Sequence, residues 1–323
     1  MAGEKKLIRV VASFAHGQAL FDEISKYAHA RDEQWAYWDE FAFTTRDIAQ
    51  ADGLLVFNHP GRELSLCCDP AAVIAFMMEP GIRRKHPWMF RRLDQYAAVY
   101  SPVRNSPNTV VSHGYLGWYG SHDWNFYHQL PVPQKTRSFS CIASSLTQLR
   151  GHRLRIQFID QLQREMTGID FFGKGSQYLP DKLDGLLPYR FSIAIENTTI
   201  PDYFTEKIND CFLAYTVPVY HGCTNLEKYF PEGSFIRIDI HNPARAIATI
   251  RDAMENDDWE KRLNAVKEAR SLVLDHYQPL AGAAQIFRGL PYSGKGEQVQ
   301  LRTVPESISR KVRKLFYLKK QQP

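Results

Sequence analysis

The sequence lacks a long apolar run. Hydrophobic residues make up 44% of the chain, yet none of their stretches approaches the roughly 18 residues of a membrane-spanning helix. Nor do the first residues indicate a secretory signal, because Glu4, Lys5 and Lys6 lead directly into a short stretch, residues 7–11, that is typical of a strand. We therefore expect a cytoplasmic protein.

Cysteine is scarce as well. The five cysteines are odd in number, include the adjacent pair Cys67 and Cys68, and show neither C-x-x-C nor Cys/His metal spacing. This pattern indicates neither a disulfide framework nor a metal site built on cysteine. It fits a reducing cytoplasm best.

Positive charge is concentrated at one end. The net charge is +5, but residues 302–323 hold seven Lys and Arg against one acidic residue, so the preceding 301 residues carry about −1. In a helix, the apolar side chains from Ile308 to Phe316 would share one face and the cations the rest. This predicts peripheral binding to an anionic membrane surface, such as the inner face of the cytoplasmic membrane. A solvated terminus is the alternative, and no motif supports nucleic acid as a partner.

The distribution of apolar segments predicts two α/β domains. The chain of 323 residues is long enough for two cores, and short apolar strands alternate with helical stretches, as in parallel β/α units. The proline-marked stretch around Pro131 and Pro133 is the natural linker. We predict a first domain at 1–130, a second domain at 131–280, and a basic tail with an amphipathic helix at 281–323. The expected strands are residues 7–14, 53–58, 73–78, 96–100, 137–144, 169–173, 189–196, 217–222 and 235–239, and the main helices are residues 20–30, 149–166, 203–215, 243–255 and 259–276.

Residues 189–239 are the most informative segment. An apolar strand is followed by a polar exit and by a helix, residues 203–215, that Asp202 is suited to cap. An open α/β sheet builds a site for a phosphorylated ligand in this way. The stripe of this helix that we expect to be buried consists of Ile208, Cys211, Phe212 and Tyr215.

Three residues share another face of that helix. Tyr203, Glu206 and Lys207 are spaced i, i+3, i+4 within the first turns, where backbone N–H groups and the helix dipole favour an anion. Lys207 would neutralise a phosphate, whereas Glu206 suits a pair of hydroxyls such as those of a ribose. On spacing alone, a solvated helix face is the alternative.

The order of residues in this segment resembles the donor-binding signature of glycosyltransferase family 10, the α1,3/4-fucosyltransferases. The matching pieces are I-E-N-T at 195–198, D-Y-F-T-E-K at 202–207, T-V-P-V-Y-H-G at 216–222 and Y-F-P-E-G-S-F-I at 229–236. Thr198 stands where the family has serine, and Ile195 where it has an aromatic residue. Tyr215, in place of a small residue, and His221 border the place where the base or sugar of the donor would lie.

This resemblance implies a fold and a donor. The fold is α/β of the GT-B type, in which two Rossmann-like domains face each other across a cleft. The domain at 1–130 would bind the acceptor, and the domain at 131–280 the nucleotide-sugar donor. The implied donor is a nucleotide sugar, GDP-fucose, and the implied protein is a soluble or peripheral member of bacterial type.

Two more residues match the family on the donor side. Arg155 begins the segment R-I-Q-F-I-D-Q-L, which looks like the family's R-x-x-F motif, and its planar guanidinium suits a diphosphate. Arg150 and Arg153 are alternatives. Asn197 is implied to contact the sugar or phosphate of the donor, with a turn-stabilising amide as the alternative. We do not expect the neighbouring Glu196 to be catalytic.

Glu79 is the predicted base. It follows the apolar strand at residues 73–78, and burial against methionine side chains would raise its pKa above about 4.3 and make it a better proton acceptor. The family has a glutamate after a comparable strand, placed to deprotonate the attacking hydroxyl. A turn residue is the alternative to this role, and His113 is a competing base. The aromatic stretch 113–120 would line the acceptor or form a satellite hydrophobic cluster.

These residues together predict an inverting glycosyltransferase. Glu79 would deprotonate an acceptor hydroxyl, which attacks the anomeric carbon of GDP-fucose while the diphosphate leaves toward Lys207 and Arg155. Glu206 and Tyr203 would hold the nucleoside. No Asp-x-Asp pair stands where a metal-dependent transferase would need one, so we expect no metal and no other cofactor.

The acceptor and two alternatives stay open at this stage. We expect an oligosaccharide or glycolipid acceptor, such as lipopolysaccharide O-antigen, modified at the 3-hydroxyl of N-acetylglucosamine or glucose. One alternative is the same fold with a different nucleotide sugar. The other is a non-catalytic carbohydrate-binding protein.

Overall fold

The computed structural model describes residues 5–143, 150–173, 177–256, 258–291 and 296–304. The amphipathic helix predicted in the basic tail lies outside these residues. Within them, no helix combines the length and the apolar character that crossing a bilayer requires.

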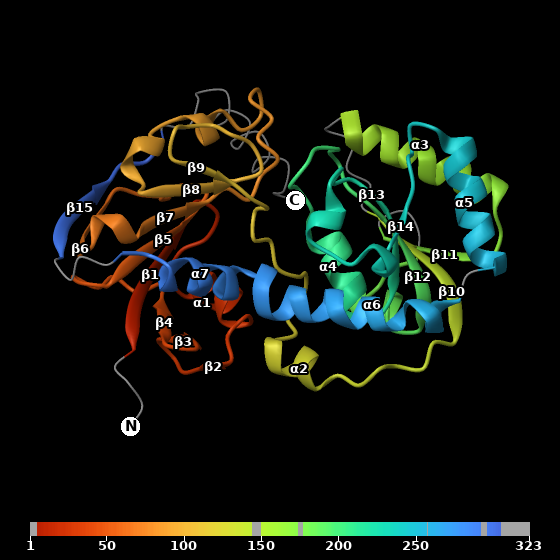
Figure 1. Ribbon diagram of the computed structural model, residues 1–323, viewed down its shortest axis with the longest axis horizontal. Helices are drawn as coiled ribbons and strands as arrows, with labels where there is room; N and C mark the ends of the chain where they lie inside the picture. Colours follow the sequence, from red (N-terminus) through yellow and green to blue (C-terminus); the bar gives the residue numbers. More distant parts are fainter. Residues whose placement is uncertain (1–4, 144–149, 174–176, 257, 292–295, 305–323) are drawn as a thin grey trace, which may run out of the picture.

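The first half of the chain forms a mainly parallel sheet (Figure 1). In the described residues it has eight strands, in the spatial order β2-β3-β4-β1-β5-β7-β8-β9. Strands β4, β1, β5, β7, β8 and β9 pair in parallel in this spatial order. At one edge, β2 pairs antiparallel with β3, and β3 with β4. The strands are β1 (Lys6–Ala12), β2 (Ala30–Arg31), β3 (Ala36–Trp38), β4 (Phe41–Thr44), β5 (Gly53–Phe57), β7 (Val73–Phe76), β8 (Ala98–Ser101) and β9 (Thr109–Val111), and the helices of this half are α1 (Gly17–Ser25) and α2 (Trp124–Gln129).

The second half contains an all-parallel sheet. Its order in the described part of the chain is β11-β10-β12-β13-β14. Because helices follow β10, β12 and β14, this half is built from β/α units, as the alternating pattern predicted. Its elements are β10 (Arg137–Ile142), α3 (Arg150–Glu165), β11 (Ile169–Phe172), β12 (Tyr189–Ile195), α4 (Glu206–Leu213), β13 (Val217–His221), β14 (Ile236–Arg237), α5 (Pro243–Asn256) and α6 (Trp259–Leu272).

After the second sheet, the chain returns to the first sheet. Part of the segment that was predicted to be a basic tail therefore belongs to the folded first half. After α6 it enters α7 (Pro279–Arg288), where Phe287 packs on Phe41 of β4. Strand β15 (Glu297–Leu301) pairs antiparallel with β6 (Leu64–Cys68). The boundary predicted at residue 280 was therefore wrong. Phe287 of α7 contacts Phe41, which lies 246 residues earlier in the chain, and no local sequence pattern shows such a contact.

One buried apolar cluster runs through both halves. It joins Leu55 and Phe57 of the first sheet to Phe191 and Ile193 of the second, by way of α4, α6 and α7. A smaller cluster covers the other face of the first sheet. Both faces of the central strands are thus buried, which explains why these strands read as continuous apolar runs.

Candidate functional site

Helix α4 begins at Glu206, three residues later than predicted. Its N-cap is Thr205, whose hydroxyl accepts a hydrogen bond from the backbone N–H of Lys207 at 3.4 Å. Asp202 instead adopts a left-handed conformation, with φ at 56°. Its carboxylate accepts a hydrogen bond of 2.9 Å from Lys228. The prediction that Asp202 caps the helix was wrong because tertiary partners engage its side chain.

Hydrogen bonds to Glu196 connect the C-terminal end of β12 to the N-terminus of α4. Its side chain is fully buried and accepts hydrogen bonds from the backbone N–H and the hydroxyl of Thr205, at 2.9 and 2.8 Å. Lys207 Nζ lies 3.2 Å from its second carboxylate oxygen. With both oxygens engaged, Glu196 holds Lys207 in place.

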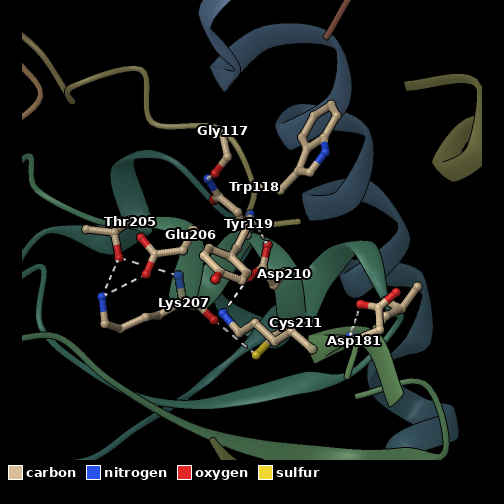
Figure 2. Close-up of polar contacts among 12 residues, drawn as sticks. Gly117, Trp118, Tyr119, Asp181, Thr205, Glu206, Lys207, Asp210 and Cys211 are labelled. Carbon is tan, nitrogen blue, oxygen red and sulfur yellow. Dashed lines mark hydrogen bonds and ion pairs between the residues drawn. The ribbon is translucent and has the colours of Figure 1, made fainter. Parts of the chain in front are cut away.

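Lys207 and Glu206 form a charged pair at the first turn of α4 (Figure 2). Lys207 Nζ is 3.1 Å from Glu206 Oε1, and the two side chains stay 24% and 34% exposed. Burial of the Glu206 carboxyl raises its pKa, but attraction to Lys207 and Lys182 outweighs this and lowers the pKa to about 2. Burial disfavours the ammonium of Lys207, yet Glu196 and Glu206 raise its pKa. Both groups are therefore charged at neutral pH.

A cavity of about 430 Å³ opens at the carboxyl ends of the second sheet's strands. It brings together four of the predicted donor residues, Arg155, Asn197, Glu206 and Lys207, from α3, the exit of β12 and α4. Such strand exits are where open α/β sheets bind ligands. The remaining lining residues are Tyr119, Cys141, Ile142, Ala143, His152, Ile159, Gly173, Lys182, Ile193 and Ile195.

Close packing at Gly151 brings α3 to this cavity. A Cβ at Gly151 would lie 1.9 Å from the carbonyl oxygen of Asn197, so only glycine permits this approach. One turn further, Arg155 is 4% exposed, and burial lowers the pKa of its guanidinium. Asn197 Nδ2 lies 3.2 Å from His152 Nε2, and within the described residues its Oδ1 accepts no hydrogen bond. A ligand hydroxyl or amine would satisfy that acceptor.

Tyr203 does not share the exposed face predicted for it. It precedes the helix, is 5% exposed and is absent from the lining of this cavity. Burial raises the pKa of its hydroxyl well above the usual value, and the carboxylates of Glu196, Glu79 and Glu206 add to the effect. Tyr203 therefore lies near Glu79 of the first half as well as near the two glutamates of its own half.

A second cavity, of about 390 Å³, opens at the strand exits of the first sheet. Phe14 follows β1, Phe57 ends β5 and Met78 follows β7, and all three line it. Tyr119 and Glu206 line both cavities, so the two meet at these side chains. The other lining residues are Ala15, Ala19, Glu23, Ile24, Tyr27, Leu116, Gly117, Trp118 and Pro279.

Glu79 lies beyond the end of β7, but it is not buried as predicted. Its side chain is 45% exposed, and Oε2 is 3.3 Å from Nε2 of His86. Burial against methionine was the wrong reason to expect a basic carboxylate here, because the chain turns outward after Met77 and exposes the glutamate. One of its partners is thus an imidazole. Glu79 is absent from the lining of both cavities, although its neighbour Met78 lines the second.

His113 is unsuited to act as a base. It is 2% exposed, its ring stacks on Phe204 with centroids 5.0 Å apart, and burial lowers its pKa to about 3. The aromatic stretch 113–120 contributes both to the core and to the cavities. Trp118 is 2% exposed, belongs to the core and lines the second cavity, whereas Tyr119 is 66% exposed and lines both cavities.

Sequence reasoning missed a group of residues beside Lys207. Lys182 forms an ion pair with Asp210 of α4, and Asp210 Oδ1 accepts a hydrogen bond of 3.0 Å from the backbone N–H of Tyr119 (Figure 2). Asp210 follows Glu206 by four residues, so helical spacing alone could have placed it on the same face. Lys182 carries no such signal because it belongs to a separate element, the short 3-10 helix at Lys182–Gly185.

Comparison with known proteins agrees with this geometry. A model of the C-terminal domain of glycosyltransferase family 10 (fucosyltransferase) matches residues 132–262. Residues 132–262 thus match a glycosyltransferase family 10 domain. This confirms the resemblance seen in the sequence, and the domain contains α3, β12 and α4, which build the first cavity.

Individual relatives match over part of their length. Alpha-(1,3)-fucosyltransferase 4 of Mus musculus is 34% identical over 152 residues, which are 45% of this chain and 34% of that protein. A 4-galactosyl-N-acetylglucosaminide 3-alpha-L-fucosyltransferase of Pongo pygmaeus is 24% identical over 177 residues, 53% of this chain and 48% of that protein. The chain thus spans about half the length, or less, of these curated relatives.

Solved structures share the fold of the family 10 domain and of the half before it. A crystal structure of an alpha1,3-fucosyltransferase, 14% identical, covers 85% of this chain and 92% of its own with a TM-score of 0.50. An E. coli structure described as trehalose-6-phosphate bound with UDP-2-fluoro glucose, 7% identical, covers 87% and 98% with the same TM-score. At these identities the likeness concerns the fold, which is the predicted GT-B arrangement.

Proposed function

We propose that this protein is an inverting glycosyltransferase that transfers fucose from GDP-fucose to a hydroxyl of an oligosaccharide or glycolipid. The observation that carries the proposal is the meeting of the two cavities at Glu206 and Tyr119. One cavity lies in the family 10 domain and is lined by cations, and the other lies at the strand exits of the opposite sheet. A transferase needs such a junction, because its two substrates must touch at one atom.

The first cavity suits the donor. Lys207, Lys182 and Arg155 face the same space, and each can balance charge that develops on a departing diphosphate. Glu196 and Glu206 neutralise part of this charge in the free protein. We propose that Glu206 accepts hydrogen bonds from donor hydroxyls, since its charged carboxylate stands where the cavities join.

The reaction we propose is one displacement. Glu79 takes the proton of an acceptor hydroxyl, the oxygen forms a bond to the anomeric carbon, and the bond from that carbon to the diphosphate breaks with its electrons leaving toward Lys207 and Arg155. His86, 3.3 Å from Glu79, orients the carboxylate. The position of Glu79 supports this assignment, because the residue follows β7 at a strand exit of the first sheet and its neighbour Met78 lines the second cavity.

The acceptor class follows from chemistry and from the relatives' names. Tyr119 and Phe14 are exposed aromatic rings in the second cavity, and sugar rings stack on such faces. The Pongo pygmaeus relative is named for action on 4-galactosyl-N-acetylglucosaminides. We therefore propose a glycan that contains N-acetylglucosamine or glucose, with O-antigen as one example and N-acetyllactosamine as the first compound to test.

Titration of the protein with GDP, followed by turnover assays with GDP-fucose and N-acetyllactosamine, tests the function. We expect GDP to bind, and Lys207→Ala to weaken binding by about tenfold or more. Lys261→Ala is the matched control, because Lys261 is 83% exposed on α6. Since Lys207→Ala leaves two carboxylates without their cation, its melting curve must show that it is folded, and Lys182→Ala provides a second variant of the same cavity.

Each outcome decides between the candidates. Turnover of GDP-fucose supports the proposal. Turnover with a different nucleotide sugar but not with GDP-fucose would mean that the donor is that other sugar nucleotide. If GDP binds but no donor is turned over with any glycan of a panel, a carbohydrate-binding protein is favoured. If GDP does not bind the folded wild type, the donor cavity is assigned incorrectly.

A further inference from the structure

Three side chains with metal-binding atoms meet at the edge of the second sheet. His221 is the last residue of β13, and Asp239 and His241 follow β14. One nitrogen or oxygen of each lies within 4.8 Å of the other two. Nδ1 of His221 is 3.7 Å from Oδ1 of Asp239, and the two imidazole rings have centroids 5.6 Å apart. Parallel strands place these exits side by side, although the residues are 18 and 20 positions apart in the sequence.

The ring of His221 is oriented as a ligand would need. Its Nε2 is 3.0 Å from the hydroxyl oxygen of Thr199. When Nε2 donates its hydrogen to that oxygen, Nδ1 carries the lone pair and accepts a hydrogen bond of 3.4 Å from the backbone N–H of Ile240. The oxygen atoms of Ile238 and Asp239 lie 3.2 and 3.7 Å from this Nδ1, so an ion among the three atoms would replace the weak contact with Ile240. Hydrogen bonds such as the one to Thr199 orient the histidines of metal sites.

We propose that His221, Asp239 and His241 bind a divalent transition-metal ion, with Zn²⁺ as the best candidate. Two imidazoles and one carboxylate are a common zinc ligand set, and imidazole favours zinc, cobalt or nickel over magnesium and calcium. His221 is buried, whereas Asp239 and His241 are exposed, so an ion can enter from solvent. The remaining coordination positions are left to water or to the carbonyl oxygen of Ile238.

The site is separate from the proposed donor cavity but adjoins the loop that supplies one of its walls. Thr199, which contacts His221, lies two residues after Asn197, a lining residue of that cavity. The backbone N–H of Glu196 also donates to the carbonyl oxygen of His221 at 2.8 Å. A bound ion would hold the exits of β13 and β14 together and stabilise this loop. The metal site does not depend on the proposed function.

Metal binding by the full-length chain tests the proposal. After removal of metal with a chelator, we expect calorimetry to show one Zn²⁺ per chain, and Co²⁺ to give the visible absorption of a nitrogen- and oxygen-bound ion. His241→Ala and Asp239→Asn should each weaken Zn²⁺ binding by about tenfold or more. Both changes lie on exposed side chains, so the fold should persist. Zn²⁺ should also raise the melting temperature of the wild type and leave that of His241→Ala unchanged.

Matched exposed residues provide the controls. His128 on α2 and Asp252 on α5 lie outside the cluster, and His128→Ala and Asp252→Asn should bind Zn²⁺ as the wild type does. Thr199→Ala should weaken binding less than the loss of a ligand, because it removes only the orienting hydroxyl. Equal binding by His241→Ala and His128→Ala, or no Zn²⁺ bound by the wild type, would overturn the proposal.

Discussion

The backbone N–H of Tyr119 donates a hydrogen bond of 3.0 Å to Oδ1 of Asp210. It joins the loop that precedes α2 to the helix whose first turn carries Glu206 and Lys207. Next to Asp210, Asn209 donates to the carbonyl oxygens of residues 116 and 117, at 2.8 and 2.9 Å. Helix α4 therefore holds the donor-side charges at its start and the loop of the other cavity along its middle.

Asp210→Asn should destabilise the protein while keeping the contact with Tyr119. The amide oxygen can still accept the hydrogen bond, but Lys182 loses its charged partner. Breaking a buried ion pair costs about 3 kcal/mol or more, and the 19% exposure of Lys182 reduces this figure. Urea unfolding measures the change, with Asp252→Asn on α5 as the exposed control. Equal urea midpoints for the two variants would show that the ion pair of Lys182 and Asp210 does not stabilise the folded protein.

Glu79→Gln should remove turnover and spare donor binding. General-base catalysis contributes about 10²- to 10⁴-fold, so we expect a loss of that order in the rate of sugar transfer and an unchanged affinity for GDP. Glu63→Gln, at an exposed position, is the control. A Glu79→Gln protein with full turnover would exclude Glu79 as the base.

His113 should make the protein less stable as the pH falls. The unfolded chain binds a proton at this residue below about pH 6.5, whereas the folded protein does so only near pH 3. Because the unfolded state then holds more protons, stability falls as the pH drops through this window, by about 2 kcal/mol between pH 6.5 and 5. His113→Gln should lose less stability than the wild type over this range in urea unfolding. Identical pH dependence would mean that His113 is charged or hydrated when folded.

Gly151→Ala should damage the donor cavity through packing alone. The new methyl group would overlap the carbonyl oxygen of Asn197, so the first turn of α3 must move and displace His152 and Arg155. We expect GDP binding to weaken by about tenfold or more. Gly289→Ala is the control, because the nearest atom to its added carbon is 3.6 Å away. Unchanged GDP affinity in Gly151→Ala would show that α3 does not contribute to the site.

Local patterns in the sequence were sufficient for most of the fold. The apolar runs that predicted strands near residues 53–58, 73–78 and 217–222 correspond to β5, β7 and β13, each within two residues of its predicted ends. These strands are buried on both faces, so nearly all of their residues are apolar, and this composition marks them in the sequence. The order of residues in 195–236 was also sufficient to indicate the family, because Asn197, Glu206 and Lys207 of the donor cavity all lie in this one stretch.

Contacts between distant segments account for the errors. Asp202 is of a residue type that often caps helices, but its carboxylate accepts a hydrogen bond from Lys228 instead of from the helix. Residues 281–301 look like the start of a tail, but α7 and β15 pack against the first sheet. Glu79 follows methionines and was expected to be buried, whereas the chain turns it toward solvent and His86.

The amino-acid sequence was therefore sufficient to predict the type of fold and several site residues, but not how the site residues are arranged in space. Residue types and spacing specified parallel β/α units, a helix start with Glu206 and Lys207, and a family. Folding alone brought Lys182 to Asp210, Tyr119 to the junction of two cavities, and His221 to Asp239 and His241. The reason is physical: hydrophobic periodicity acts over a few residues, whereas burial and ion pairing depend on which segments the whole core brings together.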